Sequence, residues 1–311
     1  CAGWGWKDVF PLFLASEGNA DFKDSPYHGN DGPLHIGNVP YVDKHERMWI
    51  EAAKAAGYAE NPDYNGATQE GVGLFQFTIK DGERWGTSKA YLRPALERPN
   101  LTLKSGVLVT GLILDGNRVK GVHYLVNGVA ETAYADSEVV LASGAIGSCQ
   151  LLMLSGIGPA AELEQVGVKV AHDLPGVGKD LQDHLNIPIA FYTKEPIGIG
   201  AWTDEIIADS FVEWQEKRTG IRTSPWVASG GHVCSRPGIE PDLQLYGAIS
   251  PHRDYARFLG GQSGITGHSV LQRPNSRGEI RLRSADPVEY PAIDPKYFSS
   301  DPTGEDLATM V

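Results

Sequence analysis

The sequence predicts an α/β part followed by a part in which antiparallel strands dominate. Between residues 101 and 141, short apolar strands alternate with turn signals and lead into a helix. Between residues 186 and 295 strands dominate again, with a single helix expected around residues 203–217. A length of 311 residues allows one large or two medium domains with substantial cores.

The first hundred residues mix helices, loops and short strands. The helix expected over residues 45–57 is amphipathic, and Gly57 is placed to end it. Further helices are expected over residues 4–18 and 88–97, and strands at residues 33–36 and 71–85, the latter interrupted by a turn at residues 80–82. The sequence therefore predicts a mixed region here, without one dominant type of element.

A β-meander is expected between residues 101 and 135. Asp115, Gly116 and Asn117 form one strong turn signal, and Asn127 with Gly128 forms another. A buried strand at residues 138–141 and a helix at residues 148–154 should follow the meander. The strands of the meander are expected at residues 101–104, 111–114, 119–126 and 131–135.

Small residues separate the expected strand at 138–141 from the helix that follows. Ala142, Ser143 and Gly144 leave the backbone open to close approach by another group. In doubly wound sheets, ligands lie beyond the carboxyl ends of the strands. A nucleotide cofactor is therefore one explanation of this turn, and tight packing between helix and strand is the other.

Composition excludes several classes of protein. The net charge is −12 and basic residues are scattered, which argues against a nucleic-acid-binding surface. Three cysteines without CxxC spacing argue against a zinc site or a disulfide scaffold and favour a reducing, cytoplasmic location. No apolar run approaches 18 residues, so no transmembrane segment is expected.

The two ends of the sequence suggest a piece of a longer protein. The chain begins at Cys1 without a methionine, and its last residues, EDLATMV, are typical of the first turns of a helix. Residues 301–311 are therefore expected to be the start of a helix that continues further.

Several sequence blocks resemble one enzyme family. GAIGSCQLLMLSGIG, residues 144–158, is similar to the second signature of the glucose-methanol-choline (GMC) oxidoreductases, which are FAD enzymes. Cys149 and Asp180 depart from the family pattern, which has Pro or Ser and Asn at these positions. The resemblance covers essentially the whole chain, because other blocks follow in family order: GWGWKDVFPLF, YHGNDGPLHI, LRPALERPNLTL, DLPGVGKDLQDH and RPNSRGEIRLRSADP.

The resemblance implies both a fold and a chemistry. It implies a Rossmann-like FAD-binding part and an antiparallel-sheet substrate domain. Domain segments are then expected at residues 1–90 (mixed cap and substrate-domain segments), 91–185 (part of the FAD-binding domain) and 186–300 (substrate-binding domain). Such enzymes oxidise an alcohol at the CH–OH group: a histidine takes the hydroxyl proton, hydride moves to the flavin, and an electron acceptor reoxidises it.

The resemblance also suggests cofactor-binding residues. Val109 matches a family valine whose backbone meets the adenine end of FAD, although a plain buried strand residue is the alternative. Ala142, Ser143 and Gly144 match the turn beside the ADP moiety. The family's glycine-rich phosphate turn and its catalytic histidine are expected outside this chain, so no catalytic residue and no metal ligand is assigned.

Several functional alternatives stay open at this stage. The main interpretation is an alcohol dehydrogenase or oxidase. Its rivals are an FAD-containing lyase of the same fold and an inert fragment without the catalytic end. The sequence does not specify the alcohol, the electron acceptor or the oligomeric state. Trp202, Trp226 and Tyr246 either line an apolar substrate pocket or belong to the core. His184 is interpreted as a loop residue. Ala228 and Tyr246 replace a cysteine and an arginine characteristic of light-driven fatty-acid decarboxylases of this fold, which argues against that activity.

Overall fold

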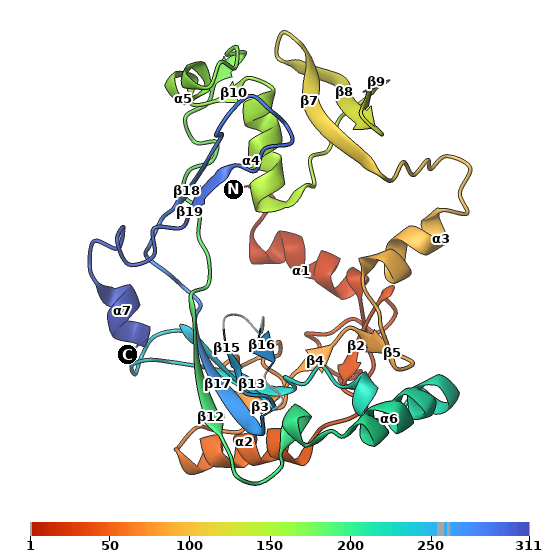
Figure 1. The fold of residues 1–311 in the computed structure, drawn as a ribbon, viewed down its shortest axis with the longest axis vertical. Coiled ribbons are helices and arrows are strands. Elements are labelled where there is room, and N and C mark those ends of the chain that lie inside the picture. The colour runs from red at the N-terminus through yellow and green to blue at the C-terminus, as the bar shows by residue number, and fades with distance from the viewer. Residues whose placement is uncertain (1, 254–257, 260–261, 311) are drawn as a thin grey trace. The chain divides into compact units, whose positions relative to one another are not determined.

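A computed structural model describes residues 2–253, 258–259 and 262–310 (Figure 1). The chain forms two compact units. Of the described residues, the first unit contains 2–102, 184–253, 258–259, 262–273 and Met310, and the second contains 103–183 and 274–309. Both units mix helices with strands, in agreement with the predicted α/β class. In the described ranges, no helix is both long enough and apolar enough to cross a membrane.

A four-stranded antiparallel sheet organises the first unit. Its strands follow the order β12 (Asn186–Tyr192), β17 (Gly264–Leu271), β14 (Leu243–Ala248) and β13 (Ser229–Val233). Because side chains alternate between the two faces of a strand, residues that face each other across the ladder share one face. The sheet therefore presents two separate sets of side chains, one on each face.

Helix α2 (Lys44–Ala55) covers one face of this sheet. Asp43 caps the helix by accepting a hydrogen bond from the His45 N–H group, and the Glu46 carboxylate accepts one from the Asp43 N–H group. Ile50 then packs against the sheet and against β3 (Gly71–Leu74), in a core that also contains Val72, Val233, Trp49, Ala53, Leu74, Leu243 and Leu245. The amphipathic helix predicted here is confirmed.

Short elements complete the first unit. Helix α1 (Trp6–Ser16) has no buried residue, and helix α6 (Asp204–Lys217) begins after Thr203, whose hydroxyl accepts a hydrogen bond from the Ile206 N–H group. The other elements are β1 (Glu17–Asn19), β2 (Leu34–Asn38), β4 (Gln76–Phe77), β5 (Ile79–Lys80), β6 (Glu83–Arg84), η1 (Ser88–Leu92), α3 (Arg93–Ala95), η2 (Gly198–Ala201), η3 (Ile221–Thr223), β15 (His252–Arg253) and β16 (Phe258–Leu259).

The second unit contains the predicted meander. Strands β7 (Val107–Asp115), β8 (Arg118–Val126) and β9 (Val129–Tyr134) pair in sequence order. Both predicted turns are confirmed, and Asn127 and Gly128 have φ of 50° and 81°, as the tight hairpin turn of this sequence requires.

Helix α4 (Gly144–Leu154) follows the meander and packs on β7. Its side chains Leu151 and Met153 are buried, and Met153 belongs to a core with Leu163, Val168, Val177 and Ile280. The remaining elements of this unit are β10 (Ile157–Gly158), α5 (Ala160–Gln165), β11 (His172–Asp173), β18 (Glu279–Arg281), β19 (Ala292–Asp294) and α7 (Glu305–Met310).

The prediction of a strand at residues 138–141 is wrong. These residues are irregular, and Val140 is 77% exposed although a buried strand was expected. An apolar sequence becomes a strand only where a neighbouring strand satisfies its backbone groups. Among the described residues no strand pairs with this segment. The same reason applies to residues 101–104, which are also irregular.

Two predicted helices have different boundaries in the structure. The helix expected from residue 148 begins at Gly144, one turn earlier. The helix expected at residues 88–97 is a π-helical turn, η1, followed by the short α3. The Arg93 N–H group bonds to the Ser88 carbonyl five residues earlier, which is the π-helical pattern. Pro94, the next residue, has no N–H group and therefore cannot donate a hydrogen bond within a regular α-helix.

Candidate functional site

The four predicted cofactor residues all lie in the second unit. Ala142, Ser143 and Gly144 form the exposed turn that leads into α4. Gly144 has φ of +77°, and a Cβ atom added there would meet no other atom within 4 Å. The Ser143 side chain makes no capping hydrogen bond, so the first turn of α4 offers open N–H groups and the positive end of a helix dipole. This turn presents bare backbone to its surroundings.

Val109 lies on β7, the strand on which α4 packs. Its side chain is half-buried, and the ladder shifts register between Val109 and Gly111, which marks a β-bulge. The Ser155 hydroxyl, just after α4, accepts a hydrogen bond from the Leu112 N–H group at 2.8 Å and donates one to the Leu151 carbonyl at 2.6 Å. The strand that carries Val109 and the helix that begins at Gly144 are thus fixed to each other.

This arrangement fits one edge of a nucleotide. A turn of small residues allows a ligand to approach the backbone, and the N-terminus of a helix favours negatively charged groups such as phosphates. The open space beside Gly144 is the observation that supports the fit, because a packed helix–strand junction would fill it.

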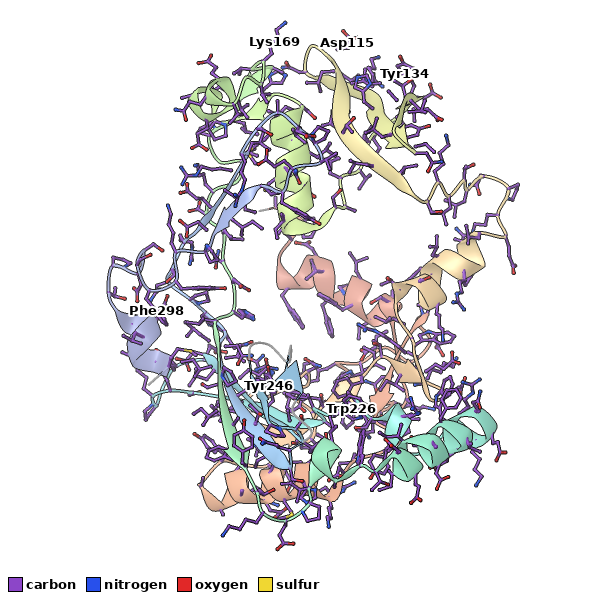
Figure 2. All side chains as sticks on the ribbon, viewed as in Figure 1. Asp115, Tyr134, Lys169, Trp226, Tyr246 and Phe298 are labelled. Atoms are coloured by element: carbon purple, nitrogen blue, oxygen red, sulfur yellow. The ribbon has the colours of Figure 1, made fainter. Side chains whose placement is uncertain are left out.

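A second candidate region lies on the face of the first unit's sheet that points away from α2. Tyr246 and His268 are paired across β14 and β17, and their rings stack with centroids 4.2 Å apart (Figure 2 labels Tyr246). The Asn186 amide nitrogen donates to the Tyr246 hydroxyl at 2.9 Å, and the Asn186 amide oxygen lies 3.0 Å from His268 Nδ1. Because an amide oxygen only accepts, the hydrogen lies on Nδ1 of His268.

Aromatic groups extend this face. The Tyr64 ring contacts the Phe75 and His232 rings at centroid distances of 5.2 and 5.6 Å. Burial lowers the pKa of His232 and raises the pKa values of Tyr64 and Tyr246, so burial favours the uncharged form of all three groups. The face therefore offers aromatic surface and uncharged hydrogen-bonding groups.

The two tryptophans form a ring pair of their own. The rings of Trp202 and Trp226 meet edge to face at 5.4 Å, whereas the ring contact of Tyr246 is with His268. Ala228 is fully buried, and its N–H group donates to the Glu46 carboxylate at 2.6 Å. His184 is an exposed residue of irregular structure, as predicted. Asn186 was missed by sequence reasoning, because its sequence context gives no sign of its partners in β14 and β17.

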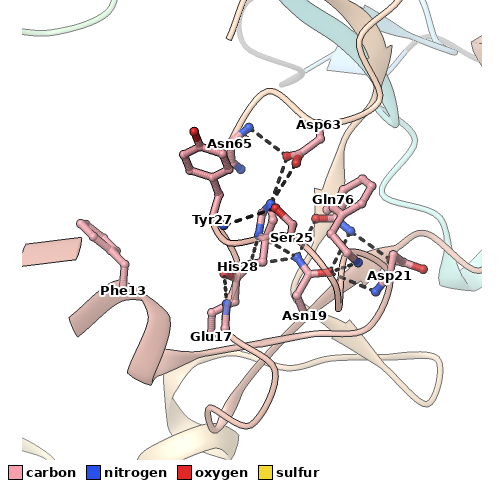
Figure 3. Close-up of polar contacts among 12 residues, drawn as sticks. Phe13, Glu17, Asn19, Asp21, Ser25, Tyr27, His28, Asp63, Asn65 and Gln76 are labelled. Carbon is pink, nitrogen blue, oxygen red and sulfur yellow. Dashed lines mark hydrogen bonds and ion pairs between the residues drawn. The ribbon is translucent and has the colours of Figure 1, made fainter. Parts of the chain in front are cut away.

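A buried polar network surrounds His28 in the first unit (Figure 3). Its Nδ1 lies 2.9 Å from the Glu17 carboxylate, and its Nε2 lies 3.1 Å from that of Asp63. The Asn19 amide nitrogen donates to Glu17 at 2.9 Å and to the Gln76 side-chain oxygen at 3.0 Å. Burial by itself lowers the pKa of His28, but the two carboxylates raise it by more, so the net shift is upward. This histidine is best explained as a structural cation.

Among the described residues, no group of three or more histidine, cysteine, aspartate or glutamate side chains is arranged to hold a metal ion.

Comparison with known proteins gives a consistent result. A family model described as GMC oxidoreductase matches residues 1–186. The chain is 39% identical to an alcohol dehydrogenase [acceptor] of Pseudomonas putida and 38% identical to a mitochondrial choline dehydrogenase of Homo sapiens. Each match covers 99% of this chain but only 56% and 52% of the relative. The chain thus spans about half the length of these curated relatives.

Solved structures agree with the fold. A pyridoxine 4-oxidase from Mesorbium loti is similar over 99% of this chain and 57% of its own, with a TM-score of 0.80 and 26% identity. A formate oxidase matches over 99% of this chain and 59% of its own, with a TM-score of 0.86. At 24% identity, the second likeness is evidence of the fold alone.

Proposed function

Because the chain belongs to the GMC oxidoreductase family, we propose that the full-length protein is an FAD-dependent oxidoreductase that acts on the CH–OH group of an alcohol. The observation that carries this proposal is the 39% identity, over 99% of the chain, to a relative named alcohol dehydrogenase [acceptor]. The relative named choline dehydrogenase supports the same reaction class. The electron acceptor is a second, unidentified partner of the reaction.

In this proposal the second unit holds part of the FAD. Ala142, Ser143 and Gly144 would border the ADP moiety, and the backbone at Val109 would border the adenine. FAD, when bound, supplies the hydride-accepting chemistry. The turn before α4 contributes an open backbone and a positive helix end, and neither needs a charged side chain.

The first unit would contribute the substrate sheet. The face with Tyr246, His268 and Asn186 supports this role, because it combines aromatic surface with uncharged hydrogen-bonding groups. Such a face suits a primary or activated alcohol, whose hydroxyl needs orientation and whose apolar part needs a dry surface. We also propose a cytoplasmic location, which the free thiols of Cys149 and Cys234 support.

Anaerobic reduction of the flavin tests the proposed function. Purified full-length protein should show flavin absorbance that bleaches when a suitable alcohol is added without oxygen, because hydride leaves the alcohol carbon for the flavin. The control is the same sample with the corresponding alkane, which carries no hydroxyl and should cause no bleaching. Bound flavin that resists a broad panel of primary and benzylic alcohols would contradict alcohol oxidation and favour a lyase.

A further inference from the structure

The Tyr246 hydroxyl has a hydrogen to donate and no acceptor for it among the described residues. A tyrosine hydroxyl can accept one hydrogen bond and donate another at the same time. Its hydrogen bond with Asn186 uses it as the acceptor, because the Asn186 amide nitrogen is the donor, at 2.9 Å. In the described part of the chain, no group accepts a hydrogen bond from this hydroxyl in return. Its hydrogen is therefore available to a bound molecule.

The Asn186 side chain that orients this hydroxyl is itself held in place. Its amide oxygen lies 3.0 Å from His268 Nδ1, and the His268 ring stacks on the ring of Tyr246. The three residues come from β12, β14 and β17, whose backbones are paired with one another in the order β12, β17, β14. Asn186 thus fixes which side of the Tyr246 hydroxyl is occupied and which side keeps the hydrogen.

Part of the Tyr246 side chain is open to a ligand. Tyr246 is half-buried, and β14 is an inner strand flanked by β13 and β17, so the exposed surface of the residue comes chiefly from its side chain. Its partner on β13 is Gly230, which has no side chain. The Phe75 ring lies over this glycine instead, since an added Cβ atom would lie 2.3 Å from Phe75 Cε2. A hydrogen-bond donor and an apolar ring therefore occupy adjoining parts of the same face.

The strands of this face carry no formal charge in the described part of the sheet. Alternation along the four strands, counted from Tyr246 and His268, assigns no aspartate, glutamate, lysine or arginine to this face. Burial lowers the pKa of His232 and raises that of Tyr246, so both are uncharged near neutral pH. These strands therefore offer no counter-charge to a cationic or an anionic alcohol, whose desolvation here would be costly.

We propose that Tyr246 is a substrate-binding residue whose hydroxyl donates a hydrogen bond to the oxygen of an uncharged alcohol, with Asn186 as its positioning residue and Phe75 against the apolar part of the same molecule. The inference rests on the proposed function and deepens it, because it names the substrate class: a neutral alcohol with an apolar body, not a charged one such as choline. An alcohol oxygen can accept this bond while its own hydrogen stays free for removal.

Anaerobic stopped-flow reduction of the flavin-loaded, full-length protein tests the role of Tyr246. Benzyl alcohol and hexan-1-ol are the uncharged probes. Tyr246→Phe keeps the ring and removes only the hydroxyl, so the dissociation constant taken from the concentration dependence of bleaching should rise about tenfold. The amplitude of bleaching, which counts competent flavin, should stay unchanged. Tyr134→Phe removes the same atom from a 75% exposed residue of the second unit and should change neither quantity (Figure 2 labels both tyrosines).

Asn186→Asp tests the positioning role. A carboxylate only accepts, so it keeps the hydrogen bond from His268 Nδ1 but draws the Tyr246 hydrogen towards itself and away from the substrate. Alcohol binding should weaken about tenfold although the Tyr246 hydroxyl is still present. Combined with Tyr246→Phe, the same substitution should cause no further loss, because both changes remove one interaction.

Choline tests the substrate class in the same assay, and it should bind at least about tenfold more weakly than the uncharged alcohols. The inference is overturned if Tyr246→Phe binds those alcohols as tightly as the parent, if the losses from the two substitutions add, or if choline binds equally well. Bleaching by choline but by neither uncharged alcohol would refute it and leave alcohol oxidation standing. Bound flavin that none of the three bleaches would contradict the proposed function as well.

Discussion

At the scale of single residues, His28 belongs to one of the sequence blocks that resemble the GMC family, and its contacts in the structure are structural ones. It lies in the block YHGNDGPLHI, and its side chain is 2% exposed and held between the carboxylates of Glu17 and Asp63. Asn19 completes the network, since its side-chain oxygen accepts hydrogen bonds from the Asp21 and Phe22 N–H groups. One buried cation thus joins the end of α1 to the loop before β3.

His28→Gln should destabilise the protein in a way that depends on pH. Removing one partner of a buried ionic network costs about 3 kcal/mol. The folded-state pKa of His28 is raised above its unfolded value, so its stabilising contribution is complete below about pH 6.5 and is lost as pH rises through the raised pKa. Urea unfolding at several pH values between about 5.5 and 8.5 checks this, and the difference between variant and parent should shrink at the alkaline end.

His184→Gln serves as the control for that experiment. His184 is exposed and irregular, so its substitution should change the free energy of unfolding by no more than about 0.5 kcal/mol. A gap between the His28 variant and the parent that stays constant over the whole pH range would contradict a protonated His28.

At the scale of elements, the decisive feature is the start of α4. Its turn is open and ends in a glycine with φ of +77°. Gly167 has the same φ of +77° and the same lack of neighbours within 4 Å, and it lies in the same unit away from the proposed cofactor edge in sequence. Substitutions at the two glycines therefore cause the same backbone strain, and only the substitution at Gly144 would also fill the proposed cofactor space.

Gly144→Asn should reduce flavin occupancy of the full-length protein, and Gly167→Asn should not. Asparagine tolerates positive φ better than other side chains, so folding should survive both substitutions. The added side chain at residue 144 would occupy space meant for the cofactor and weaken FAD binding about tenfold or more. The ratio of flavin to protein absorbance measures occupancy, and circular dichroism checks folding. Equal flavin content in the two variants would contradict the placement of FAD beside Gly144.

At the scale of the whole molecule, family membership alone does not determine which reaction the protein catalyses, because that depends on the residues of the site. In this chain Ala228 is fully buried and bears no polar side-chain atom, and the Tyr246 hydroxyl already accepts a hydrogen bond from Asn186. A fatty-acid carboxylate would need a charge-assisted, bidentate partner such as an arginine. Neither residue can provide one.

Flavin-loaded full-length protein should therefore form no alkane from palmitate under blue light. The same preparation should still be reduced by an alcohol, which shows that the flavin is competent. Gas chromatography of the illuminated sample provides the measurement. Sustained alkane formation above the dark control would show that the assignment based on Ala228 and Tyr246 is wrong.

Local signals account for the parts that the sequence predicted well. Asn127 and Gly128 favour a tight hairpin through their own backbone preferences, and Asp43 with Glu46 caps α2 from within four residues. The turn at residues 142–144 was recognised for the same reason, because small residues act through the backbone beside them. The resemblance to the GMC family likewise rests on short contiguous blocks, and comparison with known proteins confirms it.

The tertiary structure decided what depends on residues far apart in the sequence. Whether residues 138–141 form a strand depends on a neighbouring strand, and the side-chain pattern alone does not provide one. Asn186 meets Tyr246 and His268 only because β12, β14 and β17 pair in one particular register. Turns and caps are settled by interactions within a few residues, whereas strand pairing, burial and the charge of His28 are set by partners that only the folded chain brings together.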